Sequence, residues 1–136
     1  MTTAEDLPAT RSGDSIQHAV IDWRVLEELA LLQKPGAPDL RVRLMTIFLK
    51  TSLPLMDGIK AAIITSDRQL LTTSAHTLKS TCLSLGVMRL GAICAELEQL
   101  GRDNALQDAG DLPVLAEEQY AAVTAAFKEA LQQSGT

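Results

Sequence analysis

Apolar residues recur along most of this chain every three or four positions, which is the spacing of one face of an α-helix. Nothing alternates with a period of two over a useful length, so the pattern predicts no strands. Pro54 falls inside the second expected helix, where a proline predicts a kink or a break. The pattern predicts helices over about 22–33, 39–65, 66–85, 87–100 and 114–132.

Capping and helix-breaking residues set the expected boundaries. Asp22 and Asp39 are suited to cap the first two helices. The segment KPGAP (34–38) separates these helices because it holds two prolines and a glycine. Ser66, followed three residues later by Gln69, matches a capping box at the start of the third helix.

Several antiparallel helices with short connections indicate an all-α fold, an up-and-down four-helix bundle with an additional short N-terminal helix. A lone amphipathic helix is not stable in water, so the four longer helices are expected to bury their apolar faces together. Residues 1–18 are polar and lack periodicity, which is typical of a disordered tail or linker. The bundle domain is therefore placed at 19–134.

The composition argues against several classes of function. The net charge is −5 and no run of Lys or Arg exceeds a pair, so no nucleic-acid surface is expected. No apolar run approaches the roughly 18 to 20 residues of a membrane span, and the first twenty residues lack the features of a secretory signal. We therefore expect a cytoplasmic protein without direct membrane contact. Cys82 and Cys94 lack metal-site spacing and are interpreted as buried reduced thiols.

His76 interrupts the amphipathic pattern of AHTLKSTCLSLG (75–86). On a helical wheel it falls about 140° from the centre of the apolar stripe, so its ring is expected on the solvent side. It is therefore not interpreted as a core histidine, and a solvated residue without a role is the plain alternative. The stripe consists of Leu71, Ala75, Leu78, Cys82 and Leu85.

Few kinds of chemistry fit this histidine. The only other histidine is His18, and no Glu-x-x-His or His-x₃-His pairing exists, so no metal site is expected. The chain also lacks a G-x-S-x-G motif and a glycine-rich nucleotide loop. A neutral imidazole is a competent nucleophile near pH 7, and Lys79 at i+3 is placed to neutralise a phosphoryl group attached to it. These residues suit reversible carriage of a phosphoryl group.

Residues 75–102, AHTLKSTCLSLGVMRLGAICAELEQLGR, resemble the histidine-containing phosphotransfer (HPt) domain of multistep two-component relays. That family reads H-x-L-K-G-S, then L-G, then C-x-x-L-E in the next helix. A looser likeness extends over about residues 21–131. Such a domain occurs either as a free protein or as the last domain of a hybrid sensor histidine kinase. The matching residues are His76, Leu78, Lys79, Leu85, Gly86, Cys94, Leu97 and Glu98.

The resemblance implies that His76 accepts a phosphoryl group from a receiver-domain aspartate and passes it to a response regulator. It implies that Lys79 favours the phosphorylated form. It also implies that Glu98 hydrogen-bonds the imidazole, which would hold the proton on Nδ1 and leave Nε2 as the nucleophile. An ordinary surface charge is the alternative for Glu98. Arg102 is expected on the same side.

The resemblance further implies a phosphoryl carrier that is not an enzyme by itself and has no cofactor or metal of its own. The receiver partner would supply the aspartate and a bound Mg²⁺. Ser80 replaces the family's glycine and narrows the approach to the histidine slightly. A monomer is expected, and the surface that docks the receiver is expected to include Thr72, Thr73, Lys79, Ser80 and Leu83.

Two other functions stay open on these residues. A dimerising kinase domain usually carries an acidic residue directly after the histidine and a proline soon after it, but Thr77 follows here and the next proline is Pro113. A non-catalytic helical adaptor that binds receiver domains without phosphotransfer would need neither His76 nor Lys79. The presence of both side chains therefore favours phosphotransfer.

Overall fold

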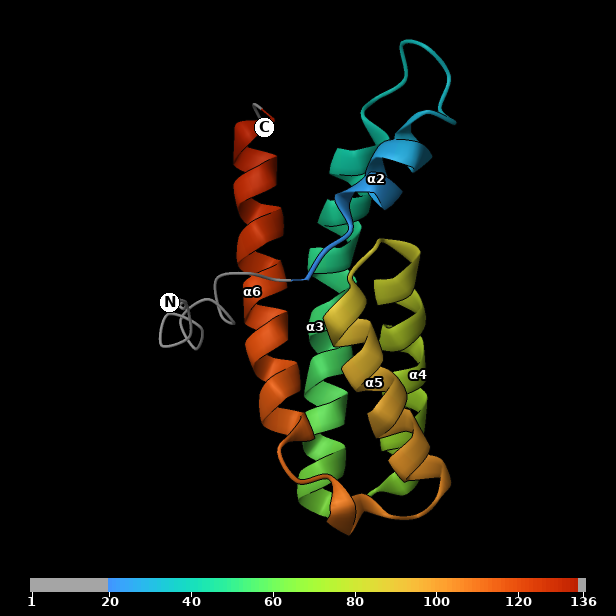
Figure 1. Ribbon diagram of the computed structural model, residues 1–136, viewed down its shortest axis with the longest axis vertical. Coiled ribbons are helices and arrows are strands. Elements are labelled where there is room, and N and C mark those ends of the chain that lie inside the picture. The colour runs from blue at the N-terminus through green and yellow to red at the C-terminus, as the bar shows by residue number, and fades with distance from the viewer. Residues whose placement is uncertain (1–19, 135–136) are drawn as a thin grey trace, which may run out of the picture.

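The computed structural model describes residues 20–134, and this part of the chain is built from helices (Figure 1). The tail expected at 1–18 lies outside the described residues. The elements in that range are α2 (Trp23–Ala30), α3 (Leu40–Thr65), α4 (Arg68–Ser84), α5 (Met88–Arg102), the 3₁₀ helix η1 (Leu106–Asp108) and α6 (Leu112–Gln133).

Helices α3, α4, α5 and α6 run alternately down and up beside one another, so the expected antiparallel four-helix bundle is confirmed (Figure 1). Contacts join α3 to α4, α4 to α5, α5 to α6 and α6 back to α3, and the contact between α4 and α5 is the most extensive. The expected short N-terminal helix is α2, which lies at one end of the bundle. Over residues 20–134 the only β-type pairing is an isolated bridge between Ile21 and Val87.

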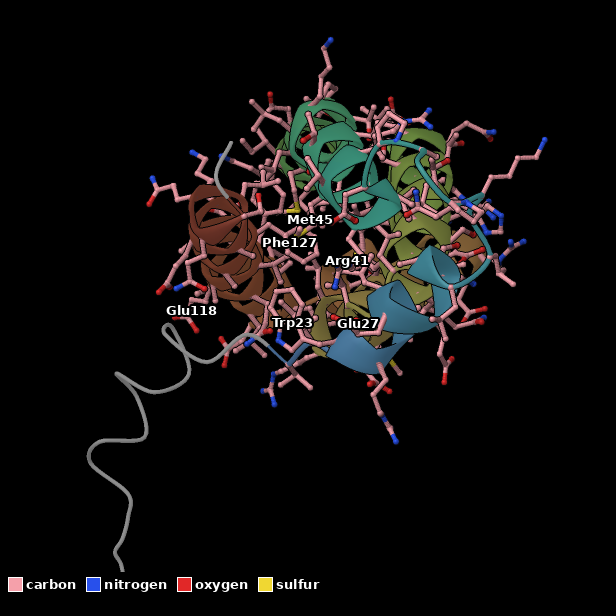
Figure 2. The ribbon with its side chains drawn as sticks, turned by 90° about the horizontal axis from the view of Figure 1, so that it is seen from above. Trp23, Glu27, Arg41, Met45, Glu118 and Phe127 are labelled. Carbon is pink, nitrogen blue, oxygen red and sulfur yellow. The ribbon has the colours of Figure 1, made fainter. Side chains whose placement is uncertain are left out.

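Apolar side chains from all five α-helices fill one core. Phe48 of α3 and Phe127 of α6 meet edge to face inside it, with ring centroids 5.3 Å apart. Trp23 of α2 packs on the same Phe127 at 5.7 Å, and Figure 2 shows Trp23, Met45 and Phe127 between α2, α3 and α6. The five-residue stripe expected on α4 is buried throughout. Removal of this apolar surface from water is what holds the helices together.

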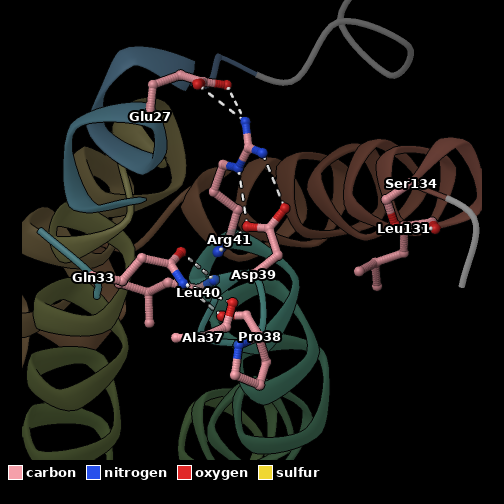
Figure 3. Close-up of polar contacts among 9 residues, drawn as sticks. All are labelled: Glu27, Gln33, Ala37, Pro38, Asp39, Leu40, Arg41, Leu131 and Ser134. Atoms are coloured by element: carbon pink, nitrogen blue, oxygen red, sulfur yellow. Dashed lines mark hydrogen bonds and ion pairs between the residues drawn. The ribbon is translucent and has the colours of Figure 1, made fainter. Parts of the chain in front are cut away.

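Polar contacts also fix α2 on the bundle. The Asp22 carboxylate caps α2 by accepting from the N–H of Arg24 at 3.1 Å, as expected. Arg41, at the start of α3, donates to both carboxylate oxygens of Glu27 on α2 and to the carboxylate of Asp39 (Figure 3). Asp39 is the expected cap of α3, because its carboxylate also accepts from the backbone N–H of Arg41 at 3.0 Å.

The side chain of Gln33 closes the loop between α2 and α3 (Figure 3). Its amide nitrogen donates to the carbonyl oxygens of Ala37 and Pro38, at 3.3 and 2.7 Å. Its amide oxygen accepts from the backbone N–H of Leu40 at 2.9 Å. The KPGAP segment therefore separates the two helices as predicted, and Gln33 holds the turn in place.

The sequence predicts a kink or a break at Pro54, and the break is wrong, because α3 runs without interruption from Leu40 to Thr65. A proline inside a helix lacks the N–H that would bond the carbonyl four residues earlier, here that of Lys50. Pro54 and Lys50 are both exposed, so water can bond the released carbonyl and the helix continues.

The capping box expected from Ser66 and Gln69 is also wrong. Ser66 instead ends α3, in the left-handed region with φ 55° and ψ 41°. Asp67 is the N-cap of α4, and its carboxylate accepts from the N–H of Leu70 at 3.1 Å. Only two residues join these helices, so one ends the first helix and the other, with its carboxylate, begins the second.

The ends of the last two helices differ from the expected ones. α5 continues to Arg102, two residues beyond its expected end, and this places the Arg102 side chain one turn after Glu98. α6 begins at Leu112, so Pro113 lies in its first turn rather than in the loop. A proline fits there because the first N–H groups of a helix have no intrahelical partner.

Candidate functional site

His76 lies in the middle of α4, on the side that faces away from the core. Its side chain is 55% exposed, whereas its neighbour Ala75 is fully buried. Helical periodicity explains the difference, because Ala75 belongs to the apolar stripe on the inner face of α4 and His76 stands one residue out of phase. The prediction of a solvent-side histidine is confirmed.

Glu98 reaches from α5 to the imidazole of His76. Its side chain is only 5% exposed, and its Oε2 atom lies 2.9 Å from Nδ1 of His76. Two cations hold the same carboxylate. Lys79 Nζ lies 2.7 Å from Oε1, and Arg102 donates to Oε2 through Nε at 3.1 Å and through Nη2. An ordinary surface charge does not fit a carboxylate that is covered and contacted by three side chains.

The neighbouring cations keep Glu98 ionised. The hydrogen bond from Lys79 is the largest cause that lowers the pKa of Glu98, from 4.5 to about 2. Burial of the carboxylate acts in the opposite direction, and the hydrogen bonds from Arg102 and His76 lower the pKa further. At neutral pH this carboxylate therefore only accepts hydrogen bonds.

An ionised acceptor selects one tautomer of the imidazole. Because the Glu98 carboxylate has no proton to donate, Nδ1 of His76 must carry the proton in the hydrogen bond between them. The lone pair of the neutral ring is then on Nε2, which points away from Glu98. An exposed ring, a fixed tautomer and adjacent cations together form a nucleophile suited to an anionic electrophile.

Two glycines let α5 lie close enough to α4 for this contact. A Cβ atom at Gly101 would overlap the hydroxyl oxygen of Thr72 and lie 3.2 Å from the carbonyl oxygen of Arg68. A Cβ atom at Gly91 would lie 2.7 Å from Leu83. Arg68 also links α4 to α5 near Gly101, because its Nε donates a hydrogen bond to the Gly101 carbonyl oxygen at 3.0 Å. Sequence reasoning missed these residues; glycine inside a helix, where it is unfavourable relative to alanine, was the available signal.

The other residues expected to dock a receiver lie on the same face of α4 as His76. They stand at positions −4, −3, +4 and +7 from the histidine, so one side of the helix presents them together. Thr73 and Ser80 are exposed, Thr72 is half-buried, and Leu83 keeps 45% of its surface in solvent.

Residues 20–134 offer little other chemistry. Cys82 and Cys94 are free and buried, as predicted, and burial raises the pKa of the Cys94 thiol to about 12. Within this range no group of three or more His, Cys, Asp or Glu side chains is arranged to hold a metal ion. Nor does any helix in it have the length and apolar character needed to cross a membrane.

The chain is similar to known proteins in both sequence and fold. The family model of the Hpt domain matches residues 43–134. Histidine-containing phosphotransfer protein B (HptB) from Pseudomonas aeruginosa PAO1 has a similar crystal structure, with a TM-score of 0.76 and 29% identity, covering 85% of this chain and 97% of that one.

The sensor protein TorS of Escherichia coli (strain K12) is 40% identical over 55 residues. These residues are 40% of this chain but 6% of TorS, so the match concerns a small part of that protein. The family match covers more than half of this chain, and its bundle is similar to that of HptB. The chain therefore belongs to the Hpt domain family and is a histidine phosphotransfer module of the kind that serves phosphorelays.

Proposed function

We propose that His76 is the phosphoacceptor of this module, taking the phosphoryl group from an aspartate of one receiver domain and passing it to the aspartate of a response regulator. The observation that carries this proposal is the hydrogen bond between Nδ1 of His76 and the buried Glu98 carboxylate. It leaves the lone pair on Nε2, in a ring exposed enough for a partner protein to cover.

The transfer is a displacement at phosphorus. The Nε2 lone pair forms a bond to the phosphorus of the receiver's aspartyl phosphate, and the P–O bond to that aspartate breaks. The electron pair of the broken bond returns to the aspartate carboxylate. The ring becomes positively charged because it keeps its proton on Nδ1, and the Glu98 carboxylate stabilises that charge. Transfer onward to the response regulator reverses these steps.

Lys79 is proposed to neutralise the phosphoryl group. It stands one helical turn after His76, and its side chain is 27% exposed, so part of this side chain is open to solvent. The carrier has no catalytic metal of its own in this proposal. A Mg²⁺ ion held by the receiver partner would steady the charge on the phosphoryl group.

The receiver is proposed to dock over His76, on the face formed by Thr72, Thr73, Ser80 and Leu83. The exposed part of Leu83 supplies apolar area two turns after the histidine on the same face, as a docking surface needs. We propose that the carrier works as a monomer in the cytoplasm, either free or as the cytoplasmic part of a membrane-bound sensor kinase.

The experiment that tests this function is transfer from a phosphorylated receiver domain to the full chain, with His76→Gln alongside. The native chain should gain a label that is labile in acid and stable in alkali, and the His76→Gln chain should gain none. Circular dichroism of both chains checks that the variant is folded. If no receiver of the source organism labels the native chain, a non-catalytic adaptor that binds receivers is the better description.

A further inference from the structure

Three side chains meet at the Glu98 carboxylate, and Arg102 has no part in the reaction as proposed so far. Oε1 of the carboxylate lies against Lys79, whereas Oε2 accepts from both His76 and Arg102. Arg102 stands in the last turn of α5, four residues after Glu98, with 54% of its side chain exposed. Two cations therefore share one buried carboxylate.

This sharing leaves the unphosphorylated site with surplus positive charge. With a neutral imidazole, Lys79 and Arg102 carry one positive charge each against the single negative charge of Glu98. Either cation alone would balance the carboxylate. The second cation is therefore available to balance another anion that enters the site.

A phosphoryl group on Nε2 of His76 is such an anion, because it brings about two negative charges. Lys79 lies one turn from His76 on the same helix, whereas Arg102 lies on α5. Were Lys79 the only cation, its movement to the phosphoryl group would leave the buried Glu98 carboxylate without one, and an uncompensated buried charge is costly. With Arg102 on Oε2, each anion keeps a cation.

We propose that Arg102 is a positioning residue that holds the Glu98 carboxylate in place while Lys79 turns from Glu98 to the phosphoryl group on His76. The inference rests on the proposed function, because it requires a phosphoryl group at His76. Arg102 acts through Glu98 and Lys79 and does not bind the phosphoryl group.

The first test follows the two cations by NMR in the full chain. Phosphoramidate serves as the donor: Nε2 bonds to phosphorus, the P–N bond of the reagent breaks, and its nitrogen leaves as ammonia. On phosphorylation the ¹⁵N signal of Lys79 Nζ should shift while that of Arg102 Nε stays. A shift of Arg102 with Lys79 unchanged would overturn the assignment.

The second test measures the lifetime of the phosphorylated chain in a double-mutant cycle. Arg102→Gln should shorten the lifetime roughly three- to tenfold, the range of a charge-assisted hydrogen bond at a half-exposed site. In a Lys79→Gln background the same change should alter the lifetime less than about twofold, because no cation remains to be released. Equal effects in both backgrounds would mean that Arg102 contacts the phosphoryl group itself, contrary to the proposal.

Arg89→Gln is the matched control, since Arg89 is an exposed arginine at the opposite end of α5. It should leave the lifetime unchanged, and thermal unfolding should show that Arg102→Gln is folded. Chemical labelling also separates this inference from the function beneath it. A chain that phosphoramidate labels at His76 but no receiver labels counts against the proposed function alone, whereas absence of any label at His76 overturns both.

Discussion

Nδ1 of His76 lies 2.9 Å from Oε2 of Glu98, although 22 positions of sequence separate the two residues. The close packing of α4 on α5 brings them together and buries the carboxylate while the imidazole stays exposed. A solvated histidine exchanges its proton between both ring nitrogens, but this one is held in a single tautomer. The pairing thereby gives a surface residue a defined nucleophilic atom.

Replacing Glu98 with leucine should release that tautomer. Both ring nitrogens of His76 should then share the proton, which the ¹⁵N shifts of the imidazole report. Phosphoryl transfer from a receiver should slow by roughly tenfold, which corresponds to about 1.4 kcal/mol of lost orientation. Glu98→Gln keeps an acceptor oxygen and should lose less, and Glu96→Leu on the exposed side of α5 is the control. An unchanged tautomer in Glu98→Leu would contradict the role given to Glu98.

The stability that Glu98 contributes should depend on pH. Its pKa is lowered in the folded chain from 4.5 to about 2, so the contribution is complete above pH 4.5 and is lost as the pH falls from 4.5 towards 2. At pH 7 this contribution to the free energy of unfolding should amount to about 1 to 2 kcal/mol. The value is modest because the partners His76 and Arg102 are half-exposed and water screens their interaction with the carboxylate.

Urea unfolding of the native chain and of Glu98→Gln at several pH values measures this contribution. The difference in the free energy of unfolding between the two chains should shrink between pH 5 and pH 3. Other carboxylates are common to both chains, so their titration cancels in the comparison. A difference that stays constant over this range would show that the negative charge of Glu98 does not stabilise the folded chain.

Gly101→Ala should destabilise the bundle where α4 and α5 are closest. The added methyl group overlaps the Thr72 hydroxyl, so the two helices must move apart. This strain should lower the free energy of unfolding by about 1 to 3 kcal/mol. Thr72→Ala removes the overlapping hydroxyl. The double variant with Gly101→Ala and Thr72→Ala should therefore regain part of the lost free energy of unfolding. If Gly101→Ala unfolds at the same urea concentration as the native chain, the close approach is not required.

Leu83→Asp should weaken receiver docking without changing the chemistry of the histidine. The exposed part of Leu83 lies two turns after His76, so a charge there meets the receiver but not the imidazole. Transfer from a receiver should need a higher receiver concentration, whereas labelling by phosphoramidate should keep its native rate. A slower phosphoramidate reaction would place Leu83 in the site instead of on the docking face.

The bundle was predictable from the sequence because the spacing of apolar residues within each helix is a local signal. Leu71, Ala75 and Leu78 repeat with helical spacing, and that spacing alone puts His76 outside the core. Local signals failed at two positions where the surroundings of the residue decide the outcome. Ser66 carries the pattern of a cap but is used to end α3, and Pro54 does not break α3 because it faces water.

The surroundings of the histidine were predictable only through the family resemblance. Spacing places Glu98 on α5, but its burial depends on how near α5 comes to α4, which Gly91 and Gly101 determine. The double use of the carboxylate by Lys79 and Arg102 likewise depends on side-chain positions that no sequence pattern encodes.

The most direct measurement is the identity of the nitrogen that carries the phosphoryl group. A ³¹P and ¹⁵N spectrum of the full chain, phosphorylated by a receiver domain, distinguishes Nε2 from Nδ1 and His76 from His18. The phosphoryl group should be on Nε2 of His76, because Glu98 holds the proton on Nδ1. A phosphoryl group on Nδ1 of His76, or on His18, would contradict the account.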